Sequence, residues 1–174
     1  MEKVFSLGFI VGRFQMFHLG HASLIQRSLS LADRTVVFVG SATESRTKRN
    51  PFIFEERKEM INSVFPQVEI LPLADIGVGN VPEWGEYLFD TIHQELNAIP
   101  DLYVCGKEDK VDNWFSMERL KGLTIEKVDR SEILISATQL RQMLLQSQKE
   151  EWERYVPSPL WDNFERYRAV LLSL

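Results

Sequence analysis

The chain has 174 residues, of which 44% are hydrophobic and 26% charged, and its formal net charge at pH 7 is −5. These values are typical of a globular protein whose length is enough to bury one full core. The negative charge argues against a protein that coats nucleic acid, because such proteins need a basic face. No apolar run is long enough to span a bilayer and no signal-peptide pattern is seen, so we expect a cytoplasmic protein without a membrane partner.

One cysteine, Cys105, excludes an internal disulfide framework and a cysteine-based zinc cluster. We expect it to be a packed strand residue. We also expect a single domain over residues 1–174, with terminal helices over 150–174 that pack on it or extend it. A second catalytic module does not fit in this length.

Short apolar runs alternate with helical segments along the chain. The run 4–11 is apolar apart from Ser6 and Gly8, which predicts a central parallel strand buried on both faces. Further strands are predicted at 35–39, 68–71, 102–105 and 123–128. Helices are predicted from 22 to a stop at Asp33, at 54–65, at 83–96, from 114 to 120, after Ser136, and after 150 with a break near Pro157. The alternation predicts an α/β fold, a Rossmann-like doubly wound parallel sheet of about five strands with C-terminal helices.

The first predicted strand is followed by the run GRFQMFHLGH at positions 12–21. A buried strand that ends in glycine and opens through a turn into a helix places free backbone amides at the carboxyl edge of the sheet, where anions bind. His18 and His21 are three residues apart, so both imidazoles lie near the first turn of a helix that begins at Gly20. This stretch therefore predicts a phosphate site flanked by two imidazole groups.

A second stretch, ISATQLR at 135–141, also predicts a helix N-terminus that can bind phosphate. Ser136 is a hydroxyl-bearing N-cap, the helix amides behind it are free, and Arg141 lies one turn into the helix. Taken alone, the segment is better explained as an ordinary N-capped amphipathic helix. Together with the first motif, it favours a receptor for the outer phosphates of a nucleoside triphosphate.

Both stretches resemble signatures of a known enzyme superfamily. The first is similar to the HxGH motif of nucleotidyltransferases, and its GRFQ start resembles the GRFQPxHxGH variant of nicotinamide-nucleotide adenylyltransferases of the archaeal and bifunctional-Nudix type, here without a Nudix domain. Met16 stands where that variant has proline. Because proline fixes the turn but lends no chemical group, we expect methionine at this position to alter binding at the phosphate site without abolishing it. The second stretch resembles the ISxTxxR motif of the same superfamily.

The resemblance implies ATP as one substrate and assigns residues to it. The groups implied to stabilise the negative charge that develops in the reaction are Arg13, His18, His21 and Arg141, with the protonation of the two histidines left open. The residues that bind ATP are these four together with Gly12, Phe14, Gly20, Gly106, Ile135, Ser136 and Thr138.

The resemblance also implies a mononucleotide as the second substrate. Arg49 matches the arginine of an Arg-Asn-Pro-Phe loop that contacts the nucleotides, although a solvated basic loop is the simpler interpretation of 46–49. Trp84 matches a tryptophan that stacks on the pyridine ring, since an indole face attracts a cationic pyridinium. The alternative interpretation is that Trp84 is a core tryptophan. Asp75 resembles an acidic position near that ring, and Asn113 is the one candidate in the loop 106–113.

The reaction needs few protein groups. The attacking phosphate oxygen of the mononucleotide is already ionised, so catalysis reduces to aligning two anions and stabilising the charge on the transferring group and on pyrophosphate. Mg²⁺ would accompany ATP and be held mainly by substrate and water, so we expect no metal ligands from the protein.

We therefore expect an enzyme that transfers the adenylyl group of ATP to nicotinamide mononucleotide, forming NAD and pyrophosphate. Other acceptors stay open, namely nicotinate mononucleotide, phosphopantetheine and flavin mononucleotide, as do CTP as donor and a non-catalytic ATP or NAD sensor. The GTFD-type start of the cytidylyl and pantetheine families differs from the run at 13–15, which argues against them. We also expect a homo-oligomer, whose interface residues would include Trp161, Phe164 and Leu171 of the terminal segment.

Overall fold

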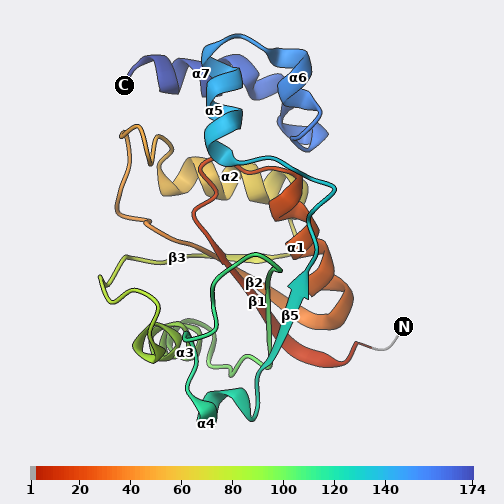
Figure 1. Cartoon of the computed structure of the whole chain (residues 1–174), viewed down its shortest axis with the longest axis vertical. Coiled ribbons are helices and arrows are strands. Elements are labelled where there is room, and N and C mark those ends of the chain that lie inside the picture. The colour runs from red at the N-terminus through yellow and green to blue at the C-terminus, as the bar shows by residue number, and fades with distance from the viewer. Residues whose placement is uncertain (1–2) are drawn as a thin grey trace. The chain divides into compact units, whose positions relative to one another are not determined.

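The computed structural model describes residues 3–174, and its strands and helices alternate in the predicted order (Figure 1). Five strands form one sheet with the order β3-β2-β1-β4-β5. The pairs β1–β4 and β4–β5 are parallel. This order is that of a doubly wound sheet, which confirms the predicted Rossmann-like α/β fold. The strands are β1 (Phe5–Gly12), β2 (Ala32–Val39), β3 (Glu69–Pro72), β4 (Leu102–Gly106) and β5 (Thr124–Val128).

The helices follow the predicted positions with three differences. They are α1 (Leu19–Leu31), α2 (Phe54–Val64), α3 (Pro82–Leu96), α4 (Met117–Leu120), α5 (Ala137–Leu145), α6 (Lys149–Glu153), the 3-10 helix η1 (Ser158–Asn163) and α7 (Phe164–Leu172). Asp33 does not stop a helix but lies inside β2, because β2 begins at the residue after α1 ends. The short helix starts later than Trp114, after the N-cap Ser116, whose hydroxyl accepts from the backbone N–H of Arg119. The terminal segment breaks at Pro157 as predicted, but η1 precedes α7.

The chain divides into two compact units, each assembled from three stretches of sequence. The first contains the described residues up to Ile10 together with 24–36 and 76–129, and the second contains 11–23, 37–75 and 130–174. Strands β1 and β2 each pass from the first unit into the second. The single domain over 1–174 stays a prediction.

Aromatic packing on β1 and β4 forms the core of the first unit. The rings of Phe9 and Tyr103 stack with centroids 4.8 Å apart, and the ring of Phe115 meets both edge-on. The carboxylate of Asp101 accepts hydrogen bonds from the backbone N–H groups of Ser6 and Leu7 at 2.8 and 2.9 Å, which fixes the start of β1 beside the loop before β4. Cys105 is buried in β4, as predicted.

Helices dominate the second unit, in which α5, α6 and α7 gather beside η1 (Figure 1). The fully buried indole of Trp152 packs edge-on against Phe164, with ring centroids 5.3 Å apart. Because Phe164 and Leu171 are buried in this unit, at 1% and 9% exposure, they do not form the oligomer interface that we expected of them. Other helices of the same chain cover the apolar side chains of Phe164 and Leu171. Trp161, at 38% exposure, is the member of the predicted set that reaches solvent.

Candidate active site

The turn between β1 and α1 has an uncommon backbone conformation. Phe14 has a φ of 52°, in the left-handed region, and its ring is buried against Gly12. A Cβ on Gly12 would lie 2.9 Å from the Phe14 ring, so glycine is required for this packing. Helix α1 begins at Leu19, three residues before the predicted start at 22 and one residue before Gly20, and His18 directly precedes it.

His18 and His21 come together as predicted. Their rings stack with centroids 3.7 Å apart. Nδ1 of His18 accepts a hydrogen bond from the backbone N–H of Gly20 at 3.1 Å, so a neutral His18 carries its proton on Nε2. A Cβ on Gly20 would lie 2.9 Å from Cε1 of His18, so the second glycine of the motif makes room for this imidazole.

Both imidazoles are held in the neutral form at pH 7. Burial lowers the pKa of His18 to about 4, with a further contribution from the positive charge of Arg130. Burial, His18 and Arg130 lower the pKa of His21 well below its ordinary value. Nδ1 of His21 is buried and has no hydrogen-bond partner among residues 3–174. The histidines can therefore serve as hydrogen-bond donors, while positive charge must come from other groups.

Arg130 is a residue that sequence reasoning missed. It lies two residues after β5 ends, in a stretch that the pattern describes only as a loop. Its charge acts on both histidines, and its Cδ would lie 3.9 Å from a Cβ on Gly20. Its position after a strand at the carboxyl edge of a sheet, five residues before the second motif, was the available signal.

Four arginines of the second unit influence one another. Burial lowers the pKa of Arg13, and the nearby charge of Arg49 lowers it further, against the opposing effects of Asp75 and Glu44. Burial also lowers the pKa of Arg141 and of Arg57, and in both cases Arg13 adds repulsion, which the carboxylates of Glu55, Asp75 and Glu56 oppose at Arg57. Arg13 is therefore the centre of a cationic cluster, which a bound polyanion would stabilise.

The second motif forms the predicted cap. Ser136 accepts from the backbone N–H of Gln139 at 3.2 Å, and the side chain of Gln139 accepts from the N–H of Ser136 at 2.9 Å, which together form a capping box. Arg141 donates to the hydroxyl of Thr138 at 3.3 Å and to the backbone carbonyl of Gln15. This last contact joins two motifs that lie 126 positions apart.

Buried polar groups anchor the turn and the loop around Arg49. The guanidinium of Arg57 is fully buried and donates to the carbonyls of Arg13, Gly40 and Ser41 at 2.9, 2.7 and 3.2 Å. Asp75 accepts from the hydroxyl of Ser41 at 2.8 Å. Sequence reasoning did not find Arg57, because a basic residue on an amphipathic helix is expected to face solvent.

Three of the predicted site residues lie in the first unit, namely Trp84, Gly106 and Asn113. The other predicted site residues lie in the second unit. Trp84 stands near the start of α3 and meets Trp114 edge-on, with ring centroids 5.8 Å apart. Its indole N–H is buried without a hydrogen-bond partner in the described chain. Asn113 is exposed, and the N–H of Gly106, at the end of β4, donates to Asp109 at 2.6 Å. Trp84 thus has an aromatic setting and a free donor.

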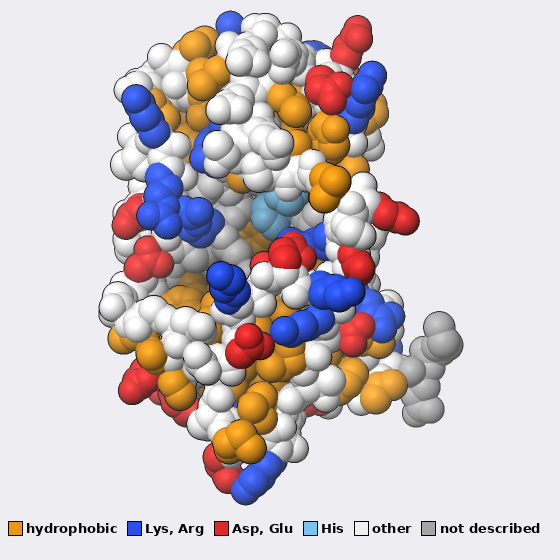
Figure 2. All heavy atoms as spheres, in the orientation of Figure 1, with side chains coloured by type: hydrophobic (Ala, Val, Ile, Leu, Met, Phe, Trp, Pro, Cys, Tyr) orange, Lys and Arg blue, Asp and Glu red, His pale blue; other side chains and the backbone are white. Residues whose placement is uncertain are grey.

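Acidic and basic side chains are interspersed over the face drawn in Figure 2, where a histidine is also visible. No group of three or more metal-ligating side chains is found among residues 3–174. Within the same range, every helix is too short or too polar to cross a bilayer.

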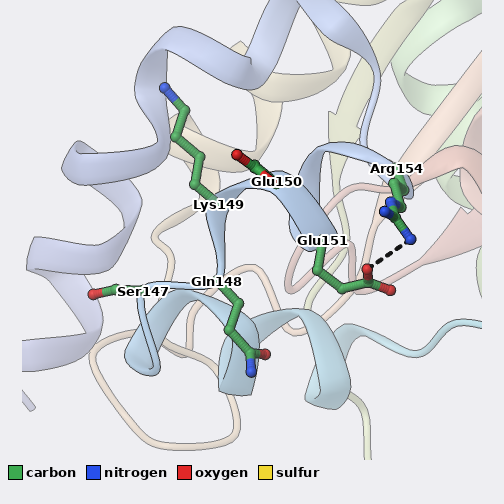
Figure 3. Close-up of a pocket in the computed structure, with 6 residues that line it drawn as sticks. All are labelled: Ser147, Gln148, Lys149, Glu150, Glu151 and Arg154. Carbon is green, nitrogen blue, oxygen red and sulfur yellow. Dashed lines mark ion pairs between the residues drawn. The ribbon is translucent and has the colours of Figure 1, made fainter.

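A hollow of about 590 Å³ lies near the start of α6 (Figure 3). Its side chains point in different directions, and Glu151 is paired with Arg154 at 3.0 Å. None of its lining residues belongs to either motif, so it adds nothing to the site. They are Ser147, Gln148, Lys149, Glu150, Glu151 and Arg154.

The chain is similar to known proteins over most of its length. The chain is 28% identical over 170 residues to the nicotinamide-nucleotide adenylyltransferase of Saccharolobus solfataricus, covering 90% of this chain and 88% of that protein. It is 29% identical over 170 residues to the enzyme of that name from Thermococcus kodakarensis, covering 94% and 84%.

Among solved structures, the fold matches a bifunctional NMN adenylyltransferase/ADP ribose pyrophosphatase from Francisella tularensis with a TM-score of 0.78 at 23% identity. The match covers 98% of this chain and 52% of that one, so the chain spans about half the length of the bifunctional protein. Another structure of that protein is a complex with AMP and a manganese ion. The family model for cytidylyltransferase-like proteins matches residues 9–143, which include both phosphate motifs. This confirms the superfamily inferred from those motifs, and the chain belongs to the cytidylyltransferase-like family.

Proposed function

We propose that this protein is a nucleotidyltransferase that joins nicotinamide mononucleotide to the adenylyl group of ATP, forming NAD and pyrophosphate. The observation that carries the proposal is the cationic cluster around Arg13, which lies in the same unit as two stacked, neutral histidines and the capped helix α5. The names of the archaeal relatives support the choice of substrates.

In the proposed reaction, a phosphate oxygen of the mononucleotide forms a bond to the α-phosphorus of ATP. The bond from that phosphorus to the oxygen of the β-phosphate breaks, and pyrophosphate leaves with the electron pair. Because the attacking oxygen is already ionised, no residue is needed to remove a proton from it.

The protein groups then align and neutralise the phosphates. Neutral His18 donates from Nε2 to a phosphoryl oxygen, and His21 donates in the same way. Arg13 and Arg141 stabilise the negative charge on the transferring group and on pyrophosphate. This division of roles follows from the lowered pKa of both histidines, which leaves charge stabilisation to the arginines.

We infer that Mg²⁺ enters as its complex with ATP. The ligands of such an ion would be phosphate oxygens and water. The ion would supply charge neutralisation on the triphosphate.

For the mononucleotide, we assign Arg49 to the phosphate, with Asp75 and Asn113 as further polar contacts. Trp84 would stack on the pyridinium ring, since an aromatic face attracts a cation. Its half-buried indole and the edge-on contact with Trp114 support this role.

The test measures pyrophosphate release from ATP and Mg²⁺ with four acceptors in parallel, identifying the products by mass. The acceptors are nicotinamide mononucleotide, nicotinate mononucleotide, phosphopantetheine and flavin mononucleotide, and CTP replaces ATP in a second series. We expect NAD from the first acceptor, and a loss of turnover without a loss of folding in His18→Ala and Arg141→Ala. ATP binding without product from any of these acceptors would refute the substrate assignment and favour a sensor or an acceptor outside this set.

A further inference from the structure

We propose that Gln15 is a positioning residue that couples the loop carrying Arg49 to Arg141 on α5. The proposal rests on the proposed function of these two arginines as nucleotide ligands. It goes beyond that function because it predicts that ATP and the mononucleotide influence each other's binding through one buried amide.

The side chain of Gln15 forms two hydrogen bonds with the Arg49 loop, one as donor and one as acceptor. Its amide N–H donates to the carbonyl of Phe52 at 2.9 Å, and its amide oxygen accepts from the N–H of Phe52 at 2.9 Å. Gln15 is only 2% exposed and Phe52 is fully buried, so water cannot replace either hydrogen bond. Phe52 lies three residues after Arg49, at the end of the same loop.

The backbone of Gln15 holds the other arginine. Its carbonyl accepts from one nitrogen of the Arg141 guanidinium, whose second nitrogen donates to Thr138. The plane of this guanidinium is therefore fixed between α5 and the turn. A movement of the turn at Gln15 must move the hydrogen-bond acceptor of Arg141.

The turn depends on these two hydrogen bonds with Phe52 because the sequence of the turn does not by itself fix its conformation. Position 16 is methionine, so no proline restricts φ there, and Phe14 is held at a φ of 52°. The two amide hydrogen bonds join this turn directly to the Arg49 loop, whereas Arg57 connects the turn to neighbouring segments through the carbonyls of Arg13, Ser41 and Ile53. Binding of a mononucleotide phosphate by Arg49 would stabilise the loop, and with it the carbonyl that orients Arg141 for ATP. Binding of either nucleotide should thus favour binding of the other.

Direct binding of ATP, measured by calorimetry without an acceptor, tests the first half of the inference. Gln15→Met keeps the size of the side chain but removes both hydrogen bonds, whereas Gln15→Glu keeps an acceptor for the Phe52 N–H and adds a negative charge. We expect both variants to weaken ATP binding about tenfold, because Arg141 loses its fixed position. Weaker binding in Gln15→Glu with parental binding in Gln15→Met would show a simple charge effect and overturn the inference.

A double-mutant cycle with Arg49→Ala tests the coupling itself. We expect Gln15→Met to raise the Kd of nicotinamide mononucleotide about tenfold in the parent and less than about twofold in the Arg49→Ala background. Equal factors in both backgrounds would contradict the coupling. Kd values are measured at a temperature well below the Tm of every variant.

Thr35→Val is the matched control for lost stability. It removes a buried hydrogen bond of 2.9 Å between Thr35 and Ser28, in the first unit, and should lower the Tm without changing either Kd. Failure of the proposed function can be distinguished from failure of this inference. A parent that binds both nucleotides without forming NAD still gives a result in these binding measurements. If the parent binds ATP alone, the comparison of the Gln15 variants in ATP binding still decides whether Gln15 positions Arg141.

Discussion

Arg57 should stabilise the protein far more than Arg166, although both arginines make short hydrogen bonds. Arg166 forms two of 2.7 Å with the carboxylate of Glu59, at the surface. Exposed pairs of this kind are worth about 0 to 1 kcal/mol, because water and side-chain entropy compete with them. Arg57 is fully buried, and its guanidinium donates to four backbone carbonyls. The carbonyl of Ile53 also accepts from the backbone N–H of Arg57, so the other three depend most on the side chain.

In Arg57→Met, the carbonyls of Arg13, Gly40 and Ser41 lose these donors. A loss of roughly 1 kcal/mol for each bond gives about 3 kcal/mol in the free energy of unfolding. Relief of the repulsion between Arg57 and Arg13 acts in the opposite direction, whereas loss of the attraction between Arg57 and the carboxylates of Glu55, Asp75 and Glu56 adds to the cost. For a chain of this length, about 3 kcal/mol corresponds to a fall in Tm of roughly 6 to 12 °C.

Urea unfolding followed by circular dichroism gives both free energies under the same conditions. Arg166→Met is the matched control, with an expected loss below about 1 kcal/mol. A loss in Arg166→Met that equals or exceeds the loss in Arg57→Met would refute the reasoning, because burial and not the number of short hydrogen bonds is the basis of the prediction.

Three further measurements address other parts of the chain. Since burial lowers the pKa of His18 to about 4, the unfolded chain binds its proton more tightly, and stability should fall as the pH drops from about 6.5 toward 4. The urea midpoint of His18→Gln should fall less over this range than that of the parent. Trp84→Ala should raise KM for the mononucleotide, and an equal rise for ATP would count against its placement. Gly85→Ala sets a Cβ 2.0 Å from the Trp114 carbonyl, which should cost about 1 to 3 kcal/mol; an unchanged Tm would disprove that clash.

The phosphate motifs were predictable because their signals are local. A strand that ends in glycine, two histidines at helical spacing and a serine N-cap each restrict the backbone within a few residues, and the structure shows these elements near their predicted bounds. Apolar runs locate buried strands for the same reason.

The supporting residues were not predictable because their roles depend on tertiary contacts. Arg57 and Arg130 are polar residues that act on groups far away in the sequence, and no spacing rule distinguishes them from solvated side chains. Gln15 stands in the GRFQ motif, but its partner Phe52 lies 37 positions away and the motif does not reveal it. The same limit explains Phe164 and Leu171. An amphipathic pattern shows that a face is covered but not whether a neighbouring helix or a second subunit covers it.

The position of Cys105 gives the protein an internal reporter of strand opening. It is the only cysteine in the chain and lies buried in β4, between β1 and β5. A thiol reagent can modify it only when this strand becomes accessible, so the labelling rate measures how often the middle of the sheet opens. Cys105 belongs to the first unit, whereas both phosphate motifs belong to the second. The rate with and without ATP would therefore reveal whether a nucleotide held by one unit restrains the opening of the other.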